Sequence, residues 1–392
     1  MSYRTTVRTF GPSPASDSFL LKGLEDPPET IFTKAAGHSS SRVELRNVKP
    51  IASYSWIGGP TPSIAVPGEE SWLKGLTIKL LRGFGGRPLL RPFPADSGVH
   101  YVDRNTSCMG HRSALIPIFA AVDSLHDDFR YRDFDLVTDR NNLRKLLRCI
   151  DGQHEKTFRI DLDVLGKTCL FTRREETLEE TITEFRGFGH DHHRIISYDF
   201  GGLKVLLRYE VDACVESESE DDSFLASFSA LSIGATGGAS TLPDDSAFSS
   251  RFGMKVKLTS PRSVVPQSSV IEITTRAARR ELDWKEAYPQ LYLSQTPYLY
   301  LAKHTRGTFG RVEKFQINSK GMAAHAREAE ASMAKLEALL SAILKAVRKH
   351  GEGVPLSLVY RAGELKLYKR KQGTRQPFGK DILSKFPRVA AT

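Results

Sequence analysis

The sequence predicts an α+β fold in which a mixed central β-sheet is flanked by helices within a single large domain. Two observations favour this class. Strand-like and helix-like segments are interleaved along the chain without a regular strand–helix–strand repeat. Hydrophobic residues make up 40% and charged residues 26% of the 392 residues. That balance supplies a packed core and excludes global disorder.

The alternation of apolar residues places the elements along the chain. Helical spacing predicts short helices over 113–125 and 142–149 and a long helix over 323–350, which ends at Gly351. Alternating or β-branched runs predict strands over 157–164, 203–215, 270–276, 299–302 and 313–317. A hairpin is expected from 356–360 and 364–368, around Ala362 and Gly363.

Two biased segments frame the predicted domain. Residues 1–44 are rich in Ser, Pro, Gly and Thr and are expected to form a mobile N-terminal lead-in. Residues 216–250 begin with acids and continue with Ser, Ala and Gly. They are either a solvated insertion between two strands or a regulatory or partner-binding loop. The folded domain is expected over 45–386, with a tail at 387–392.

Composition also limits the function classes. The net charge of +10 favours anionic partners such as nucleic acids or phosphates. The four cysteines, at 108, 149, 169 and 214, have no CxxC spacing, which argues against a zinc ribbon or a disulfide framework and fits a reducing compartment. The sequence contains no run of 18 apolar residues, so it predicts no membrane span. An intracellular protein without a membrane partner is expected.

Acidic residues on two predicted strands are the most informative feature. Glu210 and Asp212 flank Val211, so strand alternation places both carboxylates on one face. Glu272 lies between Ile271 and Ile273 on the next long strand. If the sheet brings the three acids together, their oxygens suit Mg²⁺ or Mn²⁺ and phosphodiester cleavage. The alternative is that they lie on exposed faces of edge strands, opposite Lys or Arg.

These segments, YEVDAC and VIEITTR, resemble the metal-site strands of the PD-(D/E)XK nuclease superfamily. Their surroundings are similar to its DXO-type decapping exonuclease family, which includes the partner of the nuclear 5′→3′ exoribonuclease Rat. FDLVTDRNNLRKLL, at 134–147, looks like the family's arginine motif, with Arg140 as the motif arginine. The segment 288–307 resembles the glutamine motif, with Gln290 as its glutamine. The chain thus looks like a divergent, fungal-like member with a PD-(D/E)XK-like fold.

The sequence departs from the family pattern at two points. GFGHDHH, at 187–193, aligns with the family's glycine–glutamate motif in two registers, which place either Asp191 or His193 at the glutamate. Two other interpretations of this histidine-rich segment are an ordinary polar turn and an independent metal site. The family's lysine aligns with Thr274. Arg276 lies two residues further along the same strand face and could restore positive charge, but it stays protonated and cannot serve as a base.

The resemblance implies a metal-dependent hydrolase of RNA 5′ ends, acting in mRNA decapping and RNA quality control. Such enzymes remove incomplete or non-standard caps, release pyrophosphate and often degrade RNA 5′→3′. Glu210, Asp212 and Glu272 would be catalytic. A Mg²⁺ or Mn²⁺ cofactor would be bound by Asp212, Glu272, the Ile273 carbonyl, Glu210 through water, and Asp191 or His193. Arg140, Gln290 and Arg276 would bind substrate.

By the same resemblance, the partners would be RNA 5′ ends and a 5′→3′ exoribonuclease, and the location the nucleus. The departures at Thr274 and at Asp191 or His193 leave a second hypothesis open. The chain would then be a catalytically degenerate member that binds RNA or stabilises an exoribonuclease. A third hypothesis is a DNA-directed nuclease that uses the same sheet.

Overall fold

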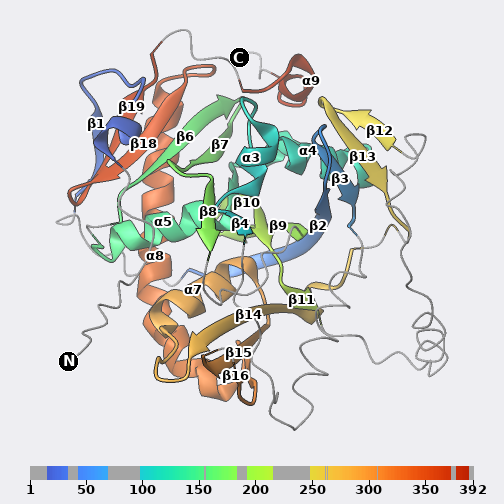
Figure 1. The fold of residues 1–392 in the computed structure, drawn as a ribbon. Helices are drawn as coiled ribbons and strands as arrows, with labels where there is room; N and C mark the ends of the chain where they lie inside the picture. The colour runs from blue at the N-terminus through green and yellow to red at the C-terminus, as the bar shows by residue number, and fades with distance from the viewer. Residues whose placement is uncertain are drawn as a thin grey trace, which may run out of the picture.

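Two sheets and one long helix form the framework of the molecule (Figure 1). The computed structural model describes residues 16–33, 43–68, 98–153, 156–182, 192–214, 248–260, 262, 264–306, 308–371 and 377–387. Within these residues the large sheet has twelve strands. In spatial order they are β1 (Glu29–Thr33), β19 (Glu364–Lys369), β18 (Leu356–Arg361), β6 (Phe158–Leu165), β7 (Thr168–Arg174), β5 (Leu136–Asp139), β10 (Leu203–Glu210), β9 (His192–Phe200), β2 (Leu45–Ile57), β3 (Ser63–Val66), β13 (Met254–Leu258) and β12 (Phe248–Arg251).

The large sheet is mixed, as the sequence predicts. Strand β5 runs parallel to both β7 and β10, and β13 runs parallel to β3, whereas the remaining neighbours are antiparallel. The α+β class with a mixed central sheet is therefore confirmed. The predicted hairpin is β18–β19, and the strand predicted over 157–164 is β6.

A smaller sheet lies below the large one in Figure 1. It comprises β11 (Ala213–Cys214), β14 (Val270–Ala277), β15 (Tyr298–Thr305), β16 (Thr308–Phe309) and β17 (Glu313–Gln316). Strands β14 and β15 are parallel, because helix α7 (Trp284–Ser294) connects them as a crossover. A separate ribbon pairs β4 (Gly98–Tyr101) with β8 (Glu179–Ile182).

Helices cover both faces of the large sheet. In β10, Val205 and Leu207 pack into the core beneath α5 (Arg140–Ile150) and α8 (Ala323–Lys349), whereas Leu206 packs into the core beneath α4 (Ile116–Leu125). This alternation is the period of two that a strand buried on both faces requires. The other helical segments are α1 (Asp17–Leu20), α3 (Arg104–Met109), α9 (Lys380–Leu383), η1 (Tyr131–Asp133), η3 (Gln267–Ser269) and η4 (Lys320–Met322).

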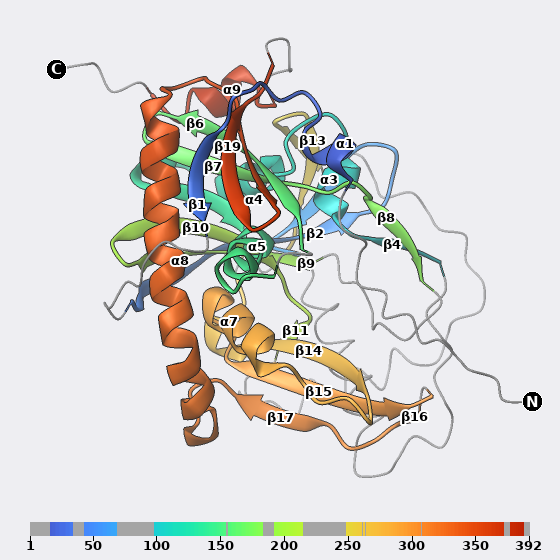
Figure 2. The ribbon, with the colours of Figure 1, turned by 90° about the vertical axis from the view of Figure 1, so that its left-hand side faces the viewer.

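Helix α8 joins the two sheets. It runs the height of the molecule, from the large sheet down to β17 (Figure 2). The apolar side predicted from the sequence is buried, with Met333, Leu336 and Leu340 in the main core. Its N-terminal turns instead pack against the small sheet, where Ala329 joins a separate cluster with Leu299 and Leu301. One helix thus fixes the position of the small sheet relative to the large one.

The N-terminal segment is partly built into the fold. Leu20 is fully buried, and β1 pairs with β19 as the outermost strand at one edge of the large sheet. The segment predicted as a mobile lead-in, 1–44, therefore contributes ordered structure between residues 16 and 33, because its apolar side chains cover Val359 and Tyr368. The acidic insertion lies outside the described residues up to 247, and its last residues belong to β12.

The helices and cysteines add two observations. Among the described helices, none combines the length and the apolar character that a membrane span requires. None of the four cysteines forms a disulfide bond, and Cys149, Cys169 and Cys214 are buried.

Candidate metal and phosphate site at the sheet junction

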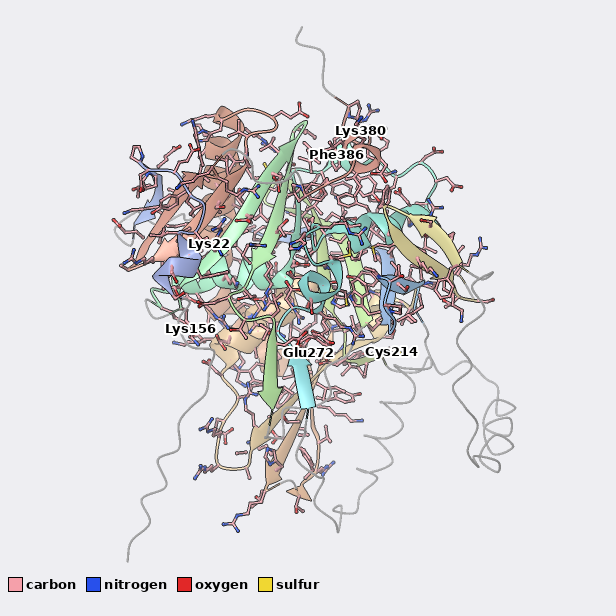
Figure 3. The ribbon with its side chains drawn as sticks, turned by 45° about the horizontal axis from the view of Figure 1, so that its top comes forward. Lys22, Lys156, Cys214, Glu272, Lys380 and Phe386 are labelled. Carbon is pink, nitrogen blue, oxygen red and sulfur yellow. The ribbon has the colours of Figure 1, made fainter. Side chains whose placement is uncertain are left out.

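The three predicted acids lie where the chain passes from the large sheet to the small one. Strand β10 ends at Glu210, and β11 begins in the small sheet after two intervening residues, so the single strand predicted over 203–215 is interrupted at Val211 and Asp212. Ala213 pairs with Ile271 of β14 in antiparallel register, so Asp212 comes level with Glu272. Figure 3 shows Glu272 beside Cys214, near the middle of the molecule. The ExD segment and the Glu272 strand are therefore neighbours.

Asp212 is tied directly to the strand that carries Glu272. The backbone N–H of Ile273 donates a hydrogen bond to Asp212 Oδ2 at 2.7 Å. Burial raises the pKa of Asp212 well above its ordinary range, and the nearby carboxylates of Glu272 and Glu210 raise it further, against the Ile273 amide and Arg140. The neighbouring carboxylates thus make ionisation of buried Asp212 costly, and a cation bound beside it would reduce that cost.

This concentration of charge predicts a pH-dependent stability. A carboxyl whose pKa is raised in the folded state binds protons more tightly there, so stability falls as pH rises from the unfolded value, near 4, through the folded pKa. Asp212→Asn removes that penalty and keeps an oxygen for the Ile273 amide. We expect its melting temperature in EDTA to exceed that of the wild type by a margin that grows with pH. A variant less stable at every pH would contradict the expectation.

Both oxygens of Glu272 accept hydrogen bonds in the structure. Arg140 Nη1 donates to Oε2 at 3.0 Å, Arg140 Nη2 lies 3.5 Å from Oε1, and Gln290 Nε2 donates to Oε1. The two charged side chains are 10% and 15% exposed, so they form a nearly buried ion pair. The predicted arginine, glutamine and second-strand acid therefore meet in one cluster, although their sequence positions span 150 residues.

Arg140 is held in place from three directions. It is the first residue of α5, and it also donates to Ser294 Oγ at 3.1 Å, near the end of α7. Its guanidinium lies over the ring of Tyr209, 5.4 Å from the centroid. Tyr209 is buried and precedes Glu210 on β10. The arginine is thus positioned against the strand that carries the acids, where it can meet a phosphate next to them.

A buried ion pair aligns the arginine strand with the acid strand. Arg208 donates to Asp139 through Nε at 2.6 Å and Nη2 at 2.8 Å, and these residues face each other in the parallel β5–β10 ladder. Asp139 directly precedes Arg140, and Arg208 lies two residues before Glu210. Arg208 also donates to the Tyr54 hydroxyl and to the Ala114 carbonyl. This pair fixes the register between the two motifs.

His193 belongs to the same buried network. Its ring stacks on Tyr54 at 4.9 Å between centroids, and its Nε2 lies 3.0 Å from Asn105 Nδ2. It also faces Glu210 across the β9–β10 ladder. Because the amide of Asn105 engages Nε2, the predicted role of that nitrogen as a metal ligand would require Asn105 to give way. Asp191, the alternative in the other register, lies outside the described residues.

Thr274, which the resemblance aligns with a lysine, contacts Arg276 on the same strand. Arg276 Nη1 donates to Thr274 Oγ1 at 3.2 Å and to the Thr275 carbonyl at 2.8 Å. These side chains follow Glu272 along β14 and are half-buried. Arg276 thus supplies a positive charge on the face that carries Thr274, as alternation predicts, but its guanidinium is directed back onto its own strand.

The oxygen atoms at the junction are of the chemical type that binds a divalent metal. Carboxylate oxygens of Asp212, Glu272 and Glu210, with a carbonyl such as that of Ile273, form the oxygen-rich set that Mg²⁺ and Mn²⁺ prefer. Burial and the neighbouring carboxylates raise the pKa of Asp212, and a cation bound at this set would lower it again. Within the residues that the structure places, however, no three such side chains are already gathered at metal-binding distance. The donors are therefore of the type that these metals prefer, and Glu272 is paired with Arg140 in this structure.

Several contributors could not be recognised from the sequence. Ser294 and Tyr209 hold Arg140, and Asp139 and Arg208 align the strands. The sequence signal for the strand-aligning pair was an arginine flanked by apolar residues on β10, because a charge in a buried strand needs a partner. Its partner could not be identified because the β5–β10 pairing joins segments about 70 residues apart.

Comparisons with known proteins give a family and a fold. A family model described as "Domain of unknown function (DUF8563)" matches residues 32–370. A comparison of the sequence with curated proteins found no significant match. Among solved structures, the chain is similar to S. pombe Rai1 in complex with 3′-FADP, with TM-score 0.51 and 12% identity over 88% of this chain and 99% of that one.

Two further fungal structures are similar to the same extent. Candida albicans Rai1 in complex with pU5-Mn²⁺ has TM-score 0.51 and 10% identity, over 92% of this chain and 99% of that one. Scheffersomyces stipitis Rai1 has TM-score 0.51 and 9% identity, over 92% and 96%. The fold expected from the resemblance is thereby confirmed across nearly the whole described chain.

Proposed function

The chain belongs to the DUF8563 family, and from that premise we propose that it is a metal-dependent enzyme that processes the 5′ ends of RNA. The observation that carries the proposal is the meeting of Asp212, Glu272, Arg140 and Gln290 at the sheet junction. It is supported by the shared fold with Rai1 proteins, one of which was crystallised with pU5 and Mn²⁺.

The proposed roles follow from the charges. Asp212, Glu272, Glu210 and the Ile273 carbonyl would hold Mg²⁺ or Mn²⁺, which supplies Lewis-acid stabilisation of a phosphate oxygen and a more acidic water. Arg140 would bind the 5′ or scissile phosphate through its planar fork. Gln290 would orient Glu272 and contact the substrate, and Arg276 would add positive charge. The expected reactions are removal of incomplete or non-standard caps, pyrophosphate release and 5′→3′ degradation.

The direct test is incubation of the purified protein with 5′-triphosphate and capped RNAs in the presence of Mn²⁺ or Mg²⁺. Release of pyrophosphate, cap or nucleotides well above an Asp212→Ala, Glu272→Ala control supports the enzyme. Product no greater than that of the control contradicts it. A preference for DNA substrates would favour a DNA-directed nuclease instead.

The Arg140–Glu272 pair predicts that phosphate and metal bind cooperatively. An RNA phosphate that draws Arg140 away releases Glu272 to the metal, and linkage makes the coupling reciprocal. We expect a 5′-phosphorylated oligonucleotide to tighten Mn²⁺ binding to the wild type by about tenfold, or ~1.4 kcal/mol. In Arg140→Gln the oligonucleotide should have little effect. Isothermal titration with Mn²⁺, with and without the oligonucleotide, measures both constants.

The matched control for this experiment is Arg148→Gln. Arg148 lies two turns along α5, and its partner Glu286 is not one of the three junction acids. It should retain the coupling of the wild type. If the oligonucleotide tightens Mn²⁺ binding equally in Arg140→Gln and in the wild type, Arg140 does not couple phosphate binding to metal binding.

Thr274→Lys is expected to raise activity. The variant would place a primary amine beside the acids, where Thr274 now only accepts from Arg276. The neighbouring guanidinium lowers the pKa of such an amine and the acids raise it, and unlike Thr274 the amine can transfer a proton and supply charge. We therefore expect an increase in initial rate of about tenfold or more. Thr275→Lys is the control, because Thr275 points to the opposite face of β14. An unchanged rate in Thr274→Lys would show that Arg276 already suffices or that the amine does not limit turnover.

The second candidate function is RNA binding without catalysis. It is favoured by the Thr274–Arg276 pair and by the engagement of both Glu272 oxygens. In that case the protein would bind 5′-phosphorylated RNA and stabilise a 5′→3′ exoribonuclease in the nucleus. RNA binding without product, together with co-purification of an exoribonuclease, would support this function over the enzyme.

A further inference from the structure

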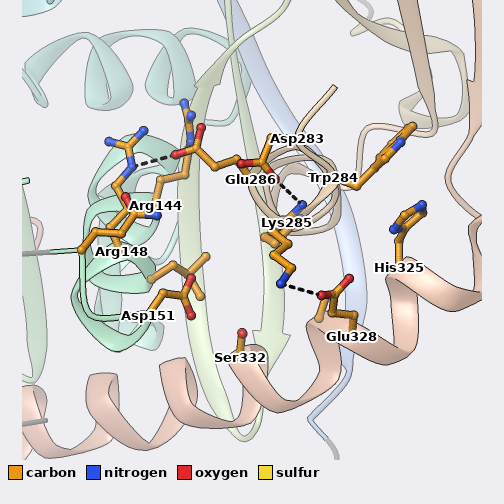
Figure 4. A pocket seen from close by; sticks show the side chains of 14 residues that line it. Arg144, Arg148, Asp151, Asp283, Trp284, Lys285, Glu286, His325, Glu328 and Ser332 are labelled. Atoms are coloured by element: carbon orange, nitrogen blue, oxygen red, sulfur yellow. Dashed lines mark hydrogen bonds and ion pairs between the residues drawn. The ribbon is translucent and has the colours of Figure 1, made fainter. Parts of the chain in front are cut away.

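A cavity separate from the junction acids lies between α5, α7 and α8 (Figure 4). Its volume is about 430 Å³, and Arg144, Arg148, Trp284 and His325 are among its lining residues. Glu210, Asp212, Glu272 and Gln290 do not line it. The volume lies within the range of roughly 300–1,000 Å³ that is typical of small-molecule sites.

Arg144 differs from its neighbours on α5 in having no ion-pair partner among the described residues. Arg140, Arg144 and Arg148 recur every four residues along α5, so they lie on one side of the helix. Arg140 pairs with Glu272, and Arg148 pairs with Glu286 at 3.2 Å. Arg144, between them, makes neither a hydrogen bond nor an ion pair with the rest of the described chain. Arg144 is one of the residues that line the cavity.

The surroundings of Arg144 compensate its charge only in part. Burial lowers the pKa of Arg144 to about 10, and the charges of Arg140 and Arg148 lower it further, against the smaller opposing effects of Glu286 and Glu272. The acids that line the cavity have other roles: Glu286 pairs with Arg148, Glu328 with Lys285, and Asp283 caps the start of α7. Asp151, the remaining lining acid, is exposed to solvent. An anion inside the cavity would therefore supply the missing counter-charge.

The far end of the cavity is aromatic. Trp284 stacks on His325 with 4.9 Å between ring centroids, and Figure 4 shows this pair at the opposite side from Arg144 and Arg148. A ligand that fills the cavity would thus meet guanidinium groups at one end and aromatic rings at the other. A phosphate bound to a nucleoside has these two parts, because the phosphate is anionic and the base is a flat ring that stacks on aromatic side chains.

We propose that this cavity is a second binding site, independent of the junction acids, that takes a mononucleotide with its phosphate on Arg144 and its base toward Trp284. The phosphate would accept hydrogen bonds from the unpaired guanidinium. The site requires no metal, since its cations are side chains. The proposal does not depend on the function at the junction.

The test follows the fluorescence of Trp284 in EDTA, which removes metal-dependent binding at the junction. AMP should give a saturable change at submillimolar concentration, inorganic phosphate should bind at least about tenfold more weakly, and adenosine should give no change. Trp284→Phe should remove the signal. Arg144→Met should weaken AMP binding at least about tenfold, whereas Arg130→Met, at an exposed arginine that does not line the cavity, should retain the wild-type affinity. Arg144→Gln provides a second variant if Arg144→Met is poorly folded.

Three outcomes would overturn the proposal. The first is an absence of saturable change up to about 5 mM AMP. The second is equal binding by Arg144→Met and the wild type, or an equal loss of affinity in Arg130→Met. The third is equal affinity for phosphate and AMP, which would leave no role for the aromatic end.

Discussion

Replacing Glu272 by Gln is expected to lower the rate of RNA 5′-end processing by roughly 10³-fold or more, because a neutral amide cannot hold a divalent metal as a carboxylate does. The change is nearly isosteric, but the amide nitrogen replaces one of the two oxygens that accept from Arg140 and Gln290, and Arg140 loses its counter-charge. The melting temperature of the variant is therefore measured together with its rate, so that a loss of structure is not taken for a loss of catalysis. Initial rates of product release from a 5′-triphosphate RNA in Mn²⁺ measure the effect, and titration with Mn²⁺ alone shows whether metal binding is lost with it.

Glu281→Gln is the matched control for this result. Glu281 pairs with Lys303 at 3.0 Å, and its side chain is 84% exposed. It should keep the wild-type rate, because an exposed ion pair contributes little to the structure and its carboxylate does not contact the junction acids. If the activity of Glu272→Gln is within about threefold of the wild type, Glu272 is not a catalytic residue.

Asp139→Asn is expected to give the largest loss of stability. Arg208 is almost fully buried and donates two hydrogen bonds to Asp139. The variant leaves that guanidinium with its charge uncompensated, which typically costs about 3–5 kcal/mol of unfolding free energy. Denaturant titration at pH 7 measures the loss. Because the pair fixes β5 against β10, the remaining folded protein should also bind 5′-phosphorylated RNA less tightly.

Asp133→Asn is the control with the same chemistry at the surface. Asp133 pairs with Arg130, but both side chains are well exposed, so the change should be barely measurable. The double variant Asp139→Leu, Arg208→Met should be less destabilised than Asp139→Asn, since it removes both charges together. A loss below about 1 kcal/mol in Asp139→Asn would show that Arg208 finds another partner.

The local elements and the identities of the site residues followed from the sequence. Alternation identified β6, β10 and β14, and the helical repeat identified α8. These patterns are readable because each element buries one face or stripe of itself, whatever its neighbour is. The acids of β10 and β14 stood out for the same reason, since charge among buried apolar residues is costly.

Contacts between distant segments were decided by the tertiary structure. The meeting of Arg140 with Glu272, and of Asp139 with Arg208, depends on which strands pair. The same holds for residues 16–33, whose composition predicted a lead-in but whose apolar side chains cover Val359 and Tyr368. His193 was placed by Tyr54 and Asn105, which lie far away in the sequence.

The sequence by itself determined the fold class, the main strands and helices, and the residue types of a metal and phosphate site. Only the tertiary structure decided that Arg140 binds the oxygens of Glu272, and that Arg144 lines a cavity with no hydrogen-bond or ion-pair partner among the described residues. The physical reason is that periodicity records the burial of each segment against some neighbour. The identity of that neighbour depends on strand order and on ion pairs between distant segments, which leave no periodic trace in the chain.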